Sequence, residues 1–159
     1  MDLGLKGKKV IMNGGAHGLG LHSLKHFVAE GADVAFMSRK EDKIEAAKAT
    51  ISAAGSGKVH GDVVDLADGA DAYKAWLGKA QDALGGCDIF VHMASSSGAG
   101  ATGDWQKTLD MDIMAAVNAV EVLTPALAAS GSGSIVFMSS TAALETLDRK
   151  STRLNSSHQ

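Results

Sequence analysis

Short, continuous runs of apolar residues alternate with longer segments of helical periodicity along this chain. The clearest runs cover residues 10–12, 34–37, 89–91 and 135–138, and a weaker candidate covers residues 58–63. Apolar residues that follow one another without polar alternation are typical of strands that helices bury on both faces. The pattern therefore predicts five strands, with the four clearest buried on both faces.

Four segments between the apolar runs have the spacing or the composition of helices. In the first, Leu21, Leu24 and Val28 follow the i, i+3, i+7 spacing that places apolar side chains on one face. The last carries the chain's single proline, Pro125, which we expect to kink the helix or to mark its last turns. The expected helices cover residues 21–28, 41–54, 67–84 and 104–129.

Strands and helices that alternate in this way predict a doubly wound α/β domain. Each helix carries the chain back across the sheet, so the strands run parallel and the connections are right-handed. We therefore expect residues 1–147 to form one domain that ends after the fifth strand. Residues 148–159 contain one apolar residue and no periodicity. They are either a disordered tail or a non-native one, since residues 148–158 resemble the translation of a sequencing adapter.

The composition and charge of the chain argue against several classes of protein. With 45% hydrophobic and 21% charged residues, its 159 residues have the balance of one globular domain. The net charge of −3 and the lack of a basic block argue against a nucleic-acid partner. The N-terminus has no apolar signal segment, and no later apolar run approaches a membrane span. We therefore expect a soluble, cytoplasmic protein without a membrane partner, and we assign no metal ligand.

A glycine-rich segment joins the first expected strand to the first expected helix. Glycines at such a junction permit a tight turn and let backbone N–H groups approach a pyrophosphate, whose charge the helix N-terminus stabilises. A plain glycine-rich turn is the alternative, but the position between a strand and a helix favours phosphate binding. The residues that we assign to cofactor binding here are Gly14, Ala16, His17, Gly18, Leu19 and Gly20.

The end of the second expected strand bears on the choice between NAD and NADP. Ser38 stands where an acidic residue would bind the adenosine ribose of NAD, and Arg39 follows it. A guanidinium at this place can hold the 2′-phosphate of NADP with two hydrogen bonds. A solvated surface arginine is the alternative. We therefore expect NADP as the cofactor, with NAD less favoured.

The spacing of the glycines resembles the motif of a known enzyme family. Gly14-x-x-x-Gly18-x-Gly20 is similar to the Thr-Gly-x-x-x-Gly-x-Gly motif of the short-chain dehydrogenase/reductase family, with Asn13 at the threonine position. Threonine and asparagine side chains can both hydrogen-bond locally. The resemblance implies a Rossmann-type sheet with the strand order 3-2-1-4-5.

The ends of the third and fourth expected strands extend the resemblance. It implies that Asp62 accepts a hydrogen bond from the adenine amino group, with Val63 beside it in the cofactor site. A helix N-cap is the alternative for Asp62, although Asp65 suits that role better. His92 and Ala94 occupy the first and third positions of the family's Asn-Asn-Ala-Gly motif and are included among the cofactor residues. For His92, a hydrogen-bonded structural role is favoured over that of a ligand or base.

The catalytic residues implied by the resemblance are incomplete. Ser140 matches the serine that hydrogen-bonds the substrate carbonyl, and Asp112 stands at the position of the tetrad asparagine, where a carboxylate cannot donate unless protonated. The family's Tyr-x-x-x-Lys pair, its general acid/base and the lysine that tunes it, has no counterpart. Its positions fall near Arg153 and Ser157. The chain's single tyrosine, Tyr73, lies before the fourth strand and cannot substitute.

The resemblance implies an NADP-dependent oxidoreductase that transfers hydride between NADP(H) and a small-molecule carbonyl or secondary alcohol. It also implies that the chain is an N-terminal fragment, inactive by itself, of a homodimeric or homotetrameric parent. A non-catalytic NADP-binding or regulatory protein on the same fold is the alternative. The departures from the family pattern at His92, Met93, Ser95 and Asp112 favour it slightly. A third possibility is a flavodoxin-like domain, which binds a flavin and fails to bind NADPH.

Overall fold

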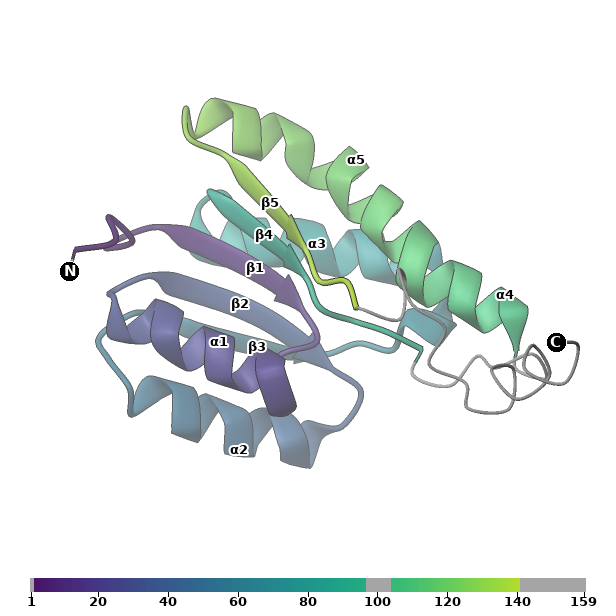
Figure 1. The fold of residues 1–159 in the computed structure, drawn as a ribbon, viewed down its shortest axis with the longest axis horizontal. Helices are drawn as coiled ribbons and strands as arrows, with labels where there is room; N and C mark the ends of the chain where they lie inside the picture. Colours follow the sequence, from purple (N-terminus) through teal and green to yellow (C-terminus); the bar gives the residue numbers. More distant parts are fainter. Residues whose placement is uncertain (1, 97–103, 141–159) are drawn as a thin grey trace, which may run out of the picture.

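Five parallel strands form one sheet in the order β3-β2-β1-β4-β5, as predicted (Figure 1). The computed structural model of the protein describes residues 2–96 and 104–140. The doubly wound fold class is therefore confirmed. The strands are β1 (Lys9–Asn13), β2 (Asp33–Ser38), β3 (Val59–Val63), β4 (Ile89–His92) and β5 (Ser134–Phe137).

Helices cover the two faces of the sheet in separate groups (Figure 1). One face carries α1 (Gly18–Ala29) and α2 (Glu41–Ser52). The other carries α3 (Ala70–Leu84) and a long helical segment that runs through α4, η2 and α5. The parts of this segment are α4 (Trp105–Thr108), the π-helical η2 (Leu109–Met114) and α5 (Ala115–Ala129).

Alternate residues of β1 contribute to two separate hydrophobic cores. Val10 and Met12 pack in the core beneath α1 and α2, whereas Ile11 packs in the core beneath α3 and α5. All three side chains are fully buried. Because successive side chains of a strand point to opposite faces, a strand between two helical layers must be apolar at every position. This explains the continuous apolar run.

The edge strand β5 does not follow this rule. Ile135, Val136 and Phe137 are 38%, 42% and 53% exposed, so the expectation that this run is buried on both faces is wrong. Among the described residues, β5 pairs with β4 alone. The apolar pattern identified the strand correctly, but it carries no information about which elements cover it.

Local chemistry accounts for the ends of several helices. Gly85 ends α3 in the left-handed conformation, with φ +73°, which glycine adopts without strain. A short 3-10 turn, η1 (Leu66–Asp68), precedes α3, and the Asp65 carboxylate accepts a hydrogen bond from the Ala67 N–H at its start. Asp65 is thus the N-cap, the role that suited it better than Asp62 in the sequence. Pro125 lies inside α5, near its end.

Residues Trp105–Ala129 form one helical segment of 25 residues. Its most apolar stretch has a mean hydropathy of 1.4 and is 28% buried, so by length and composition it could cross a membrane. The expectation that no apolar run approaches a span is therefore wrong for this helix. Core helices meet the same criteria, and Ala119 and Leu123 pack in the core beneath it. One such helix is weak evidence for a membrane location.

Candidate cofactor-binding site

A cavity of about 360 Å³ opens at the carboxyl ends of β1 to β4. Its walls come from the end of β2, from the segments that follow the four strands and from Met111 in η2. In open parallel sheets, ligands bind in the crevice outside the carboxyl ends of the strands, where the strand order reverses. Eight of the residues predicted to bind a cofactor line this cavity: Gly14, Ala16, His17, Leu19, Gly20, Ser38, Arg39 and Ala94.

The glycines of the loop after β1 allow the backbone to pack closely. Gly14 has φ +84°, and a Cβ there would lie 3.4 Å from the Ala94 backbone nitrogen. A Cβ on Gly20 would lie 2.2 Å from the carbonyl oxygen of Gly14. The loop therefore folds back onto the first turn of α1 at a distance that only glycine permits.

The first turn of α1 offers free backbone donors to the cavity. His17 is the N-cap residue of α1, and its side chain makes no capping hydrogen bond. The first N–H groups of a helix have no partner inside the helix. Since His17, Leu19 and Gly20 line the cavity, this helix N-terminus can bind an anion such as a phosphate.

Arg39 places a positive charge at the same cavity. Ser38 ends β2 half-buried, and Arg39 follows as an exposed residue that also lines the cavity. None of the three residues between Met37 and the start of α2, Ser38-Arg39-Lys40, is acidic. The strand end therefore offers a hydroxyl and a guanidinium, which suit a phosphate better than two ribose hydroxyls.

Asn13 connects the carboxyl ends of β1 and β4 from inside the protein. Its side chain is fully buried, and its Oδ1 accepts hydrogen bonds from the Met93 N–H at 2.7 Å and the Ala94 N–H at 3.1 Å. Its Nδ2 donates to the Tyr73 hydroxyl at 2.9 Å and to His92 Nδ1 at 2.8 Å. The amide thus uses both of its ends, and it fixes the turn after β4 that lines the cavity.

These contacts define the state of His92. An amide NH₂ can only donate, so His92 Nδ1 is the acceptor and the neutral ring carries its proton on Nε2. That Nε2 is buried without a hydrogen-bond partner among the described residues. Burial lowers the pKa of His92, and the nearby negative charge of Asp112 raises it in part. His92 does not line the cavity, so its position fits the favoured structural role.

The buried His92 predicts a pH-dependent stability. Because the folded pKa is lowered, the unfolded chain binds the extra proton first, and stability is lost as the pH falls through the ordinary value of about 6.5. We expect the urea midpoint to fall between about pH 7.5 and about pH 5.5, and to fall less in the His92→Asn variant. An unchanged pH dependence in that variant would contradict the assignment.

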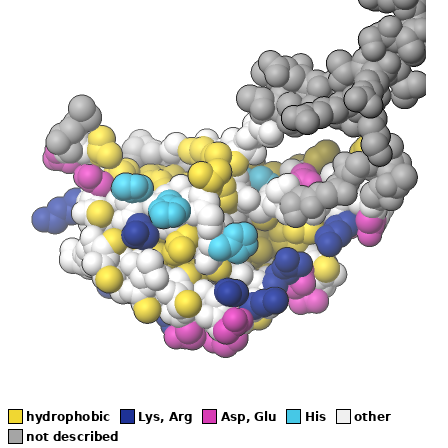
Figure 2. Space-filling view, turned by 60° about the horizontal axis from the view of Figure 1, so that its bottom comes forward, with side chains coloured by type: hydrophobic (Ala, Val, Ile, Leu, Met, Phe, Trp, Pro, Cys, Tyr) yellow, Lys and Arg dark blue, Asp and Glu magenta, His cyan; other side chains and the backbone are white. Residues whose placement is uncertain are grey.

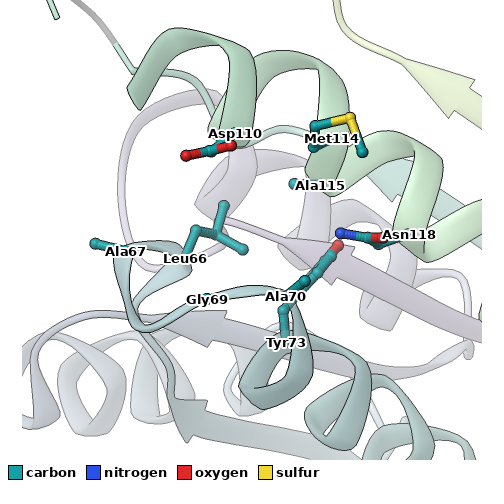
Figure 3. Close-up of a pocket in the computed structure, with 9 residues that line it drawn as sticks. All are labelled: Leu66, Ala67, Gly69, Ala70, Tyr73, Asp110, Met114, Ala115 and Asn118. Atoms are coloured by element: carbon teal, nitrogen blue, oxygen red, sulfur yellow. The ribbon is translucent and has the colours of Figure 1, made fainter. Parts of the chain in front are cut away.

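Tyr73 cannot serve as a base at neutral pH. Burial raises the pKa of its phenol well above the ordinary range, and the hydrogen bond from Asn13 lowers it only in part. The hydroxyl points into a second cavity of about 170 Å³, where Asn118 lies opposite it (Figure 3). This cavity lies between the start of α3 and the η2–α5 segment, and it shares Leu66 with the first.

Asp112 holds the chain after β4 rather than donating a proton. It lies in the π-helical η2, a type of distortion that is frequent at functional sites. Its carboxylate accepts hydrogen bonds from the Ser96 N–H at 3.1 Å and the Ser96 hydroxyl at 2.7 Å. Burial raises the pKa of Asp112, but the hydrogen bonds from Ser96 and Ser95 outweigh it and leave the pKa below its usual value. The group is therefore an acceptor at neutral pH.

Four predicted cofactor residues lie outside the cavity lining. Asp62 accepts hydrogen bonds from Lys79 Nζ and, at 3.2 Å, from Trp76 Nε1, so its carboxylate is held against α3. It lines a separate surface hollow together with Val63. Gly18 and His92 are adjacent to lining residues in the sequence, but neither contributes to the wall.

The remaining predictions concern the C-terminal part of the chain. Ser140 is exposed and lies three residues after β5, the edge strand that pairs with β4. The positions near Arg153 and Ser157, and the whole of residues 148–159, lie outside the described residues.

Sequence reasoning missed seven residues of the cavity wall. Three of them directly follow β3. One lies in η2, and neither a glycine motif nor a charge in the sequence indicated it. Met93 and Ser95 could have been predicted, because they are the sequence neighbours of Ala94, which was assigned to the site. The missed residues are Met37, Val64, Asp65, Leu66, Met93, Ser95 and Met111.

The strand order and the cavity at the strand ends define a Rossmann-type α/β domain, and comparison with known proteins narrows this class. The short chain dehydrogenase family model matches residues 8–152. Isoepoxydon dehydrogenase patN of Penicillium expansum is 29% identical over 143 residues, covering 88% of this chain and 55% of that protein. The uncharacterized oxidoreductase YvrD of Bacillus subtilis (strain 168) is 31% identical over 152 residues, covering 92% of this chain and 56% of that protein.

A solved structure gives the same assignment. The short-chain type dehydrogenase/reductase from Mycobacterium ulcerans matches with a TM-score of 0.79 at 25% identity, covering 89% of this chain and 54% of that one. The chain belongs to the short-chain dehydrogenase family. It spans about half the length of the curated relatives it matches.

Proposed function

We propose that residues 1–147 bind NADP(H) as the cofactor-binding part of an oxidoreductase. The observation that carries this proposal is the arrangement of one cavity, which brings the free N-terminus of α1 together with the Arg39 side chain. Members of this family bind nicotinamide cofactors. The partial positive charge of the α1 N-terminus and the charge of Arg39 suit a cofactor with two separate phosphate groups.

The residues of the cavity fit the parts of such a cofactor. The N–H groups at the start of α1 would bind the pyrophosphate, and Ser38 and Arg39 would bind the 2′-phosphate. Leu66 and Met111 supply an apolar wall that suits the adenine ring. The Asp62 carboxylate already accepts hydrogen bonds from Lys79 and Trp76. Other atoms of the cavity wall would therefore hydrogen-bond the adenine amino group.

The reaction that we propose is hydride transfer between NADP(H) and a carbonyl or secondary alcohol. The nicotinamide supplies the hydride, and the protein supplies binding and orientation. Ser140 would hydrogen-bond the substrate carbonyl, while Asp112 would hold the turn that carries Ser96. The sequence contains a single tyrosine, the buried Tyr73, so the 159-residue chain lacks the family's general acid/base and would be inactive by itself.

Two alternatives are less well supported. A flavodoxin-like domain has the strand order 2-1-3-4-5, whereas this sheet has the order 3-2-1-4-5, so that hypothesis is wrong. A non-catalytic binding protein is not favoured, because the matched relatives carry the names of dehydrogenases and oxidoreductases. His92 departs from the family motif, but its ring hydrogen-bonds Asn13 inside the protein and does not line the cavity.

The cofactor assignment predicts the effect of replacing Arg39. The Arg39→Ser variant should bind NADPH about tenfold to a hundredfold more weakly, because a charge-assisted pair of hydrogen bonds is lost. Its affinity for NADH should change little, since NADH has no 2′-phosphate. Fluorescence titration of the 159-residue chain with each cofactor measures both affinities.

Lys40 provides the matched control for this experiment. It is the next residue, basic and exposed, but it does not line the cavity. The Lys40→Ser variant should keep most of the NADPH affinity. An equal loss in both variants, or tighter binding of NADH than NADPH by the unmodified chain, would contradict the NADP assignment. Failure to bind either cofactor would contradict the proposed function as a whole.

A further inference from the structure

Two histidines lie on the outer side of α1, one helical turn apart. His22 and His26 are both exposed, whereas Leu24 and Val28 on the same helix are buried against the sheet. Each histidine lies two residues from the buried Leu24, which corresponds to about 200° around the helix axis. The histidines therefore point away from the core. Figure 2 shows histidine side chains gathered on one face of the molecule.

The spacing of His22 and His26 suits a shared metal ion. Side chains at i and i+4 are neighbours on a helix surface, with Cβ atoms about 5–6 Å apart. Two histidines four residues apart on one helix face can bind one ion through a ring nitrogen each. Neither ring has a hydrogen bond or ion pair with the residues that the structure describes. Both can therefore adopt the rotamers that coordination requires.

The surroundings define the kind of site. Within residues 2–96 and 104–140, no three His, Cys, Asp or Glu side chains come together as a metal cluster. The ion would thus have two protein ligands, with water completing its shell. Imidazole suits Zn²⁺, Ni²⁺ and Cu²⁺, whereas Mg²⁺ and Ca²⁺ prefer oxygen ligands.

Among the described residues, the other histidines and Cys87 are poorly placed to compete. Cys87 is buried, and burial together with the negative charge of Asp88 raises the pKa of its thiol to about 12, so the thiolate that metals require is absent. The Nε2 atoms of His60 and His92 are also buried. His17 is exposed, but it lies outside α1, at the N-cap position and with an extended backbone, five residues before His22.

We propose that His22 and His26 form a two-histidine site for Zn²⁺, Ni²⁺ or Cu²⁺ on the outer face of α1. The ion joins two successive turns of the helix whose N-terminus lines the cofactor cavity. Because the unfolded chain does not hold the two rings together, binding stabilises the folded protein. The site is independent of the nicotinamide cofactor.

The test uses the 159-residue chain with each metal alone. Electron paramagnetic resonance of one equivalent of Cu²⁺ should show coupling to two imidazole nitrogens, and Zn²⁺ or Ni²⁺ should raise the melting temperature. His22→Gln and His26→Gln should each weaken Ni²⁺ binding about tenfold or more, since the second ligand of a chelate is lost. His17→Gln is the matched control and should bind as the unmodified chain does.

Circular dichroism of each variant checks that the fold is kept, and exposed histidines are replaced at little cost to stability. Coupling to one nitrogen, or unchanged Ni²⁺ affinity in both His22→Gln and His26→Gln, would overturn the proposal. So would a loss of binding in His17→Gln equal to theirs. A rise in melting temperature with Mg²⁺ as large as that with Zn²⁺ would also contradict it, because it would indicate oxygen ligands.

Discussion

Replacing Asn13 by leucine should destabilise the fold by about 3 kcal/mol or more, because the buried groups around it lose their partners. The Met93 and Ala94 N–H groups lose their acceptor, and the Tyr73 hydroxyl and His92 Nδ1 lose their donor. Each unsatisfied buried group costs about 1–3 kcal/mol. The turn after β4 would also lose its anchor, so NADPH affinity should fall together with stability.

Urea unfolding and NADPH titration measure the two effects, and Tyr73→Phe provides the control. This variant keeps the buried ring and removes one hydrogen-bond partner of Asn13, so we expect a loss of about 1 kcal/mol. The difference between the variants reports the combined value of the contacts that Asn13 makes to the turn after β4 and to His92. A midpoint for Asn13→Leu within the error of the unmodified chain would contradict the anchoring role of Asn13.

The same residue shows what the sequence could not reveal. Asn13 was assigned a local hydrogen bond because of its place in the glycine loop. Its partners in the structure are 60 residues away at Tyr73 and 79 residues away at His92. Such partners follow from which strand ends become neighbours, and β1 pairs with β4 only in the folded sheet. A pattern in one segment cannot supply that information.

The fold itself was largely predictable. Continuous apolar strands and amphipathic helices have different periods, so their alternation identifies a parallel sheet with helices on both faces. The resemblance of the glycine loop to a known motif then supplied the strand order. The pattern was less informative about burial. It predicted that β5 is buried on both faces like β1, but β5 is exposed, whereas β1 is largely buried.

The sequence predicted those parts of the candidate site whose place depends on the backbone. It failed where the place depends on the direction of a side chain. Gly14, Gly20 and Arg39 line the cavity because their positions follow directly from strand ends. Asp62 also follows a strand, but Lys79 and Trp76 draw its carboxylate toward α3. The direction of a side chain depends on the neighbours that compete for it, and these come from another helix.

Replacing Gly20 by alanine should abolish NADPH binding while leaving most of the chain folded. The added Cβ would lie 2.2 Å from the Gly14 carbonyl oxygen and 3.2 Å from the Gly15 Cα. Both neighbours are backbone atoms, so no side-chain rotation can relieve the contact. The loop must then move away from α1, and the N–H groups of the first turn lose their alignment with the cavity. We expect a cost of about 1–3 kcal/mol in stability.

Gly78→Ala is the matched control, because it makes the same chemical change in an open environment. Gly78 lies inside α3, and an added Cβ there meets no atom within 4 Å. Alanine favours the helix over glycine, so this variant should be about 0.5–1 kcal/mol more stable and should keep its NADPH affinity. Titration with NADPH and urea unfolding distinguish the two. Equal NADPH affinity in the Gly20→Ala and Gly78→Ala variants would show that close packing of the loop on α1 does not form the phosphate site.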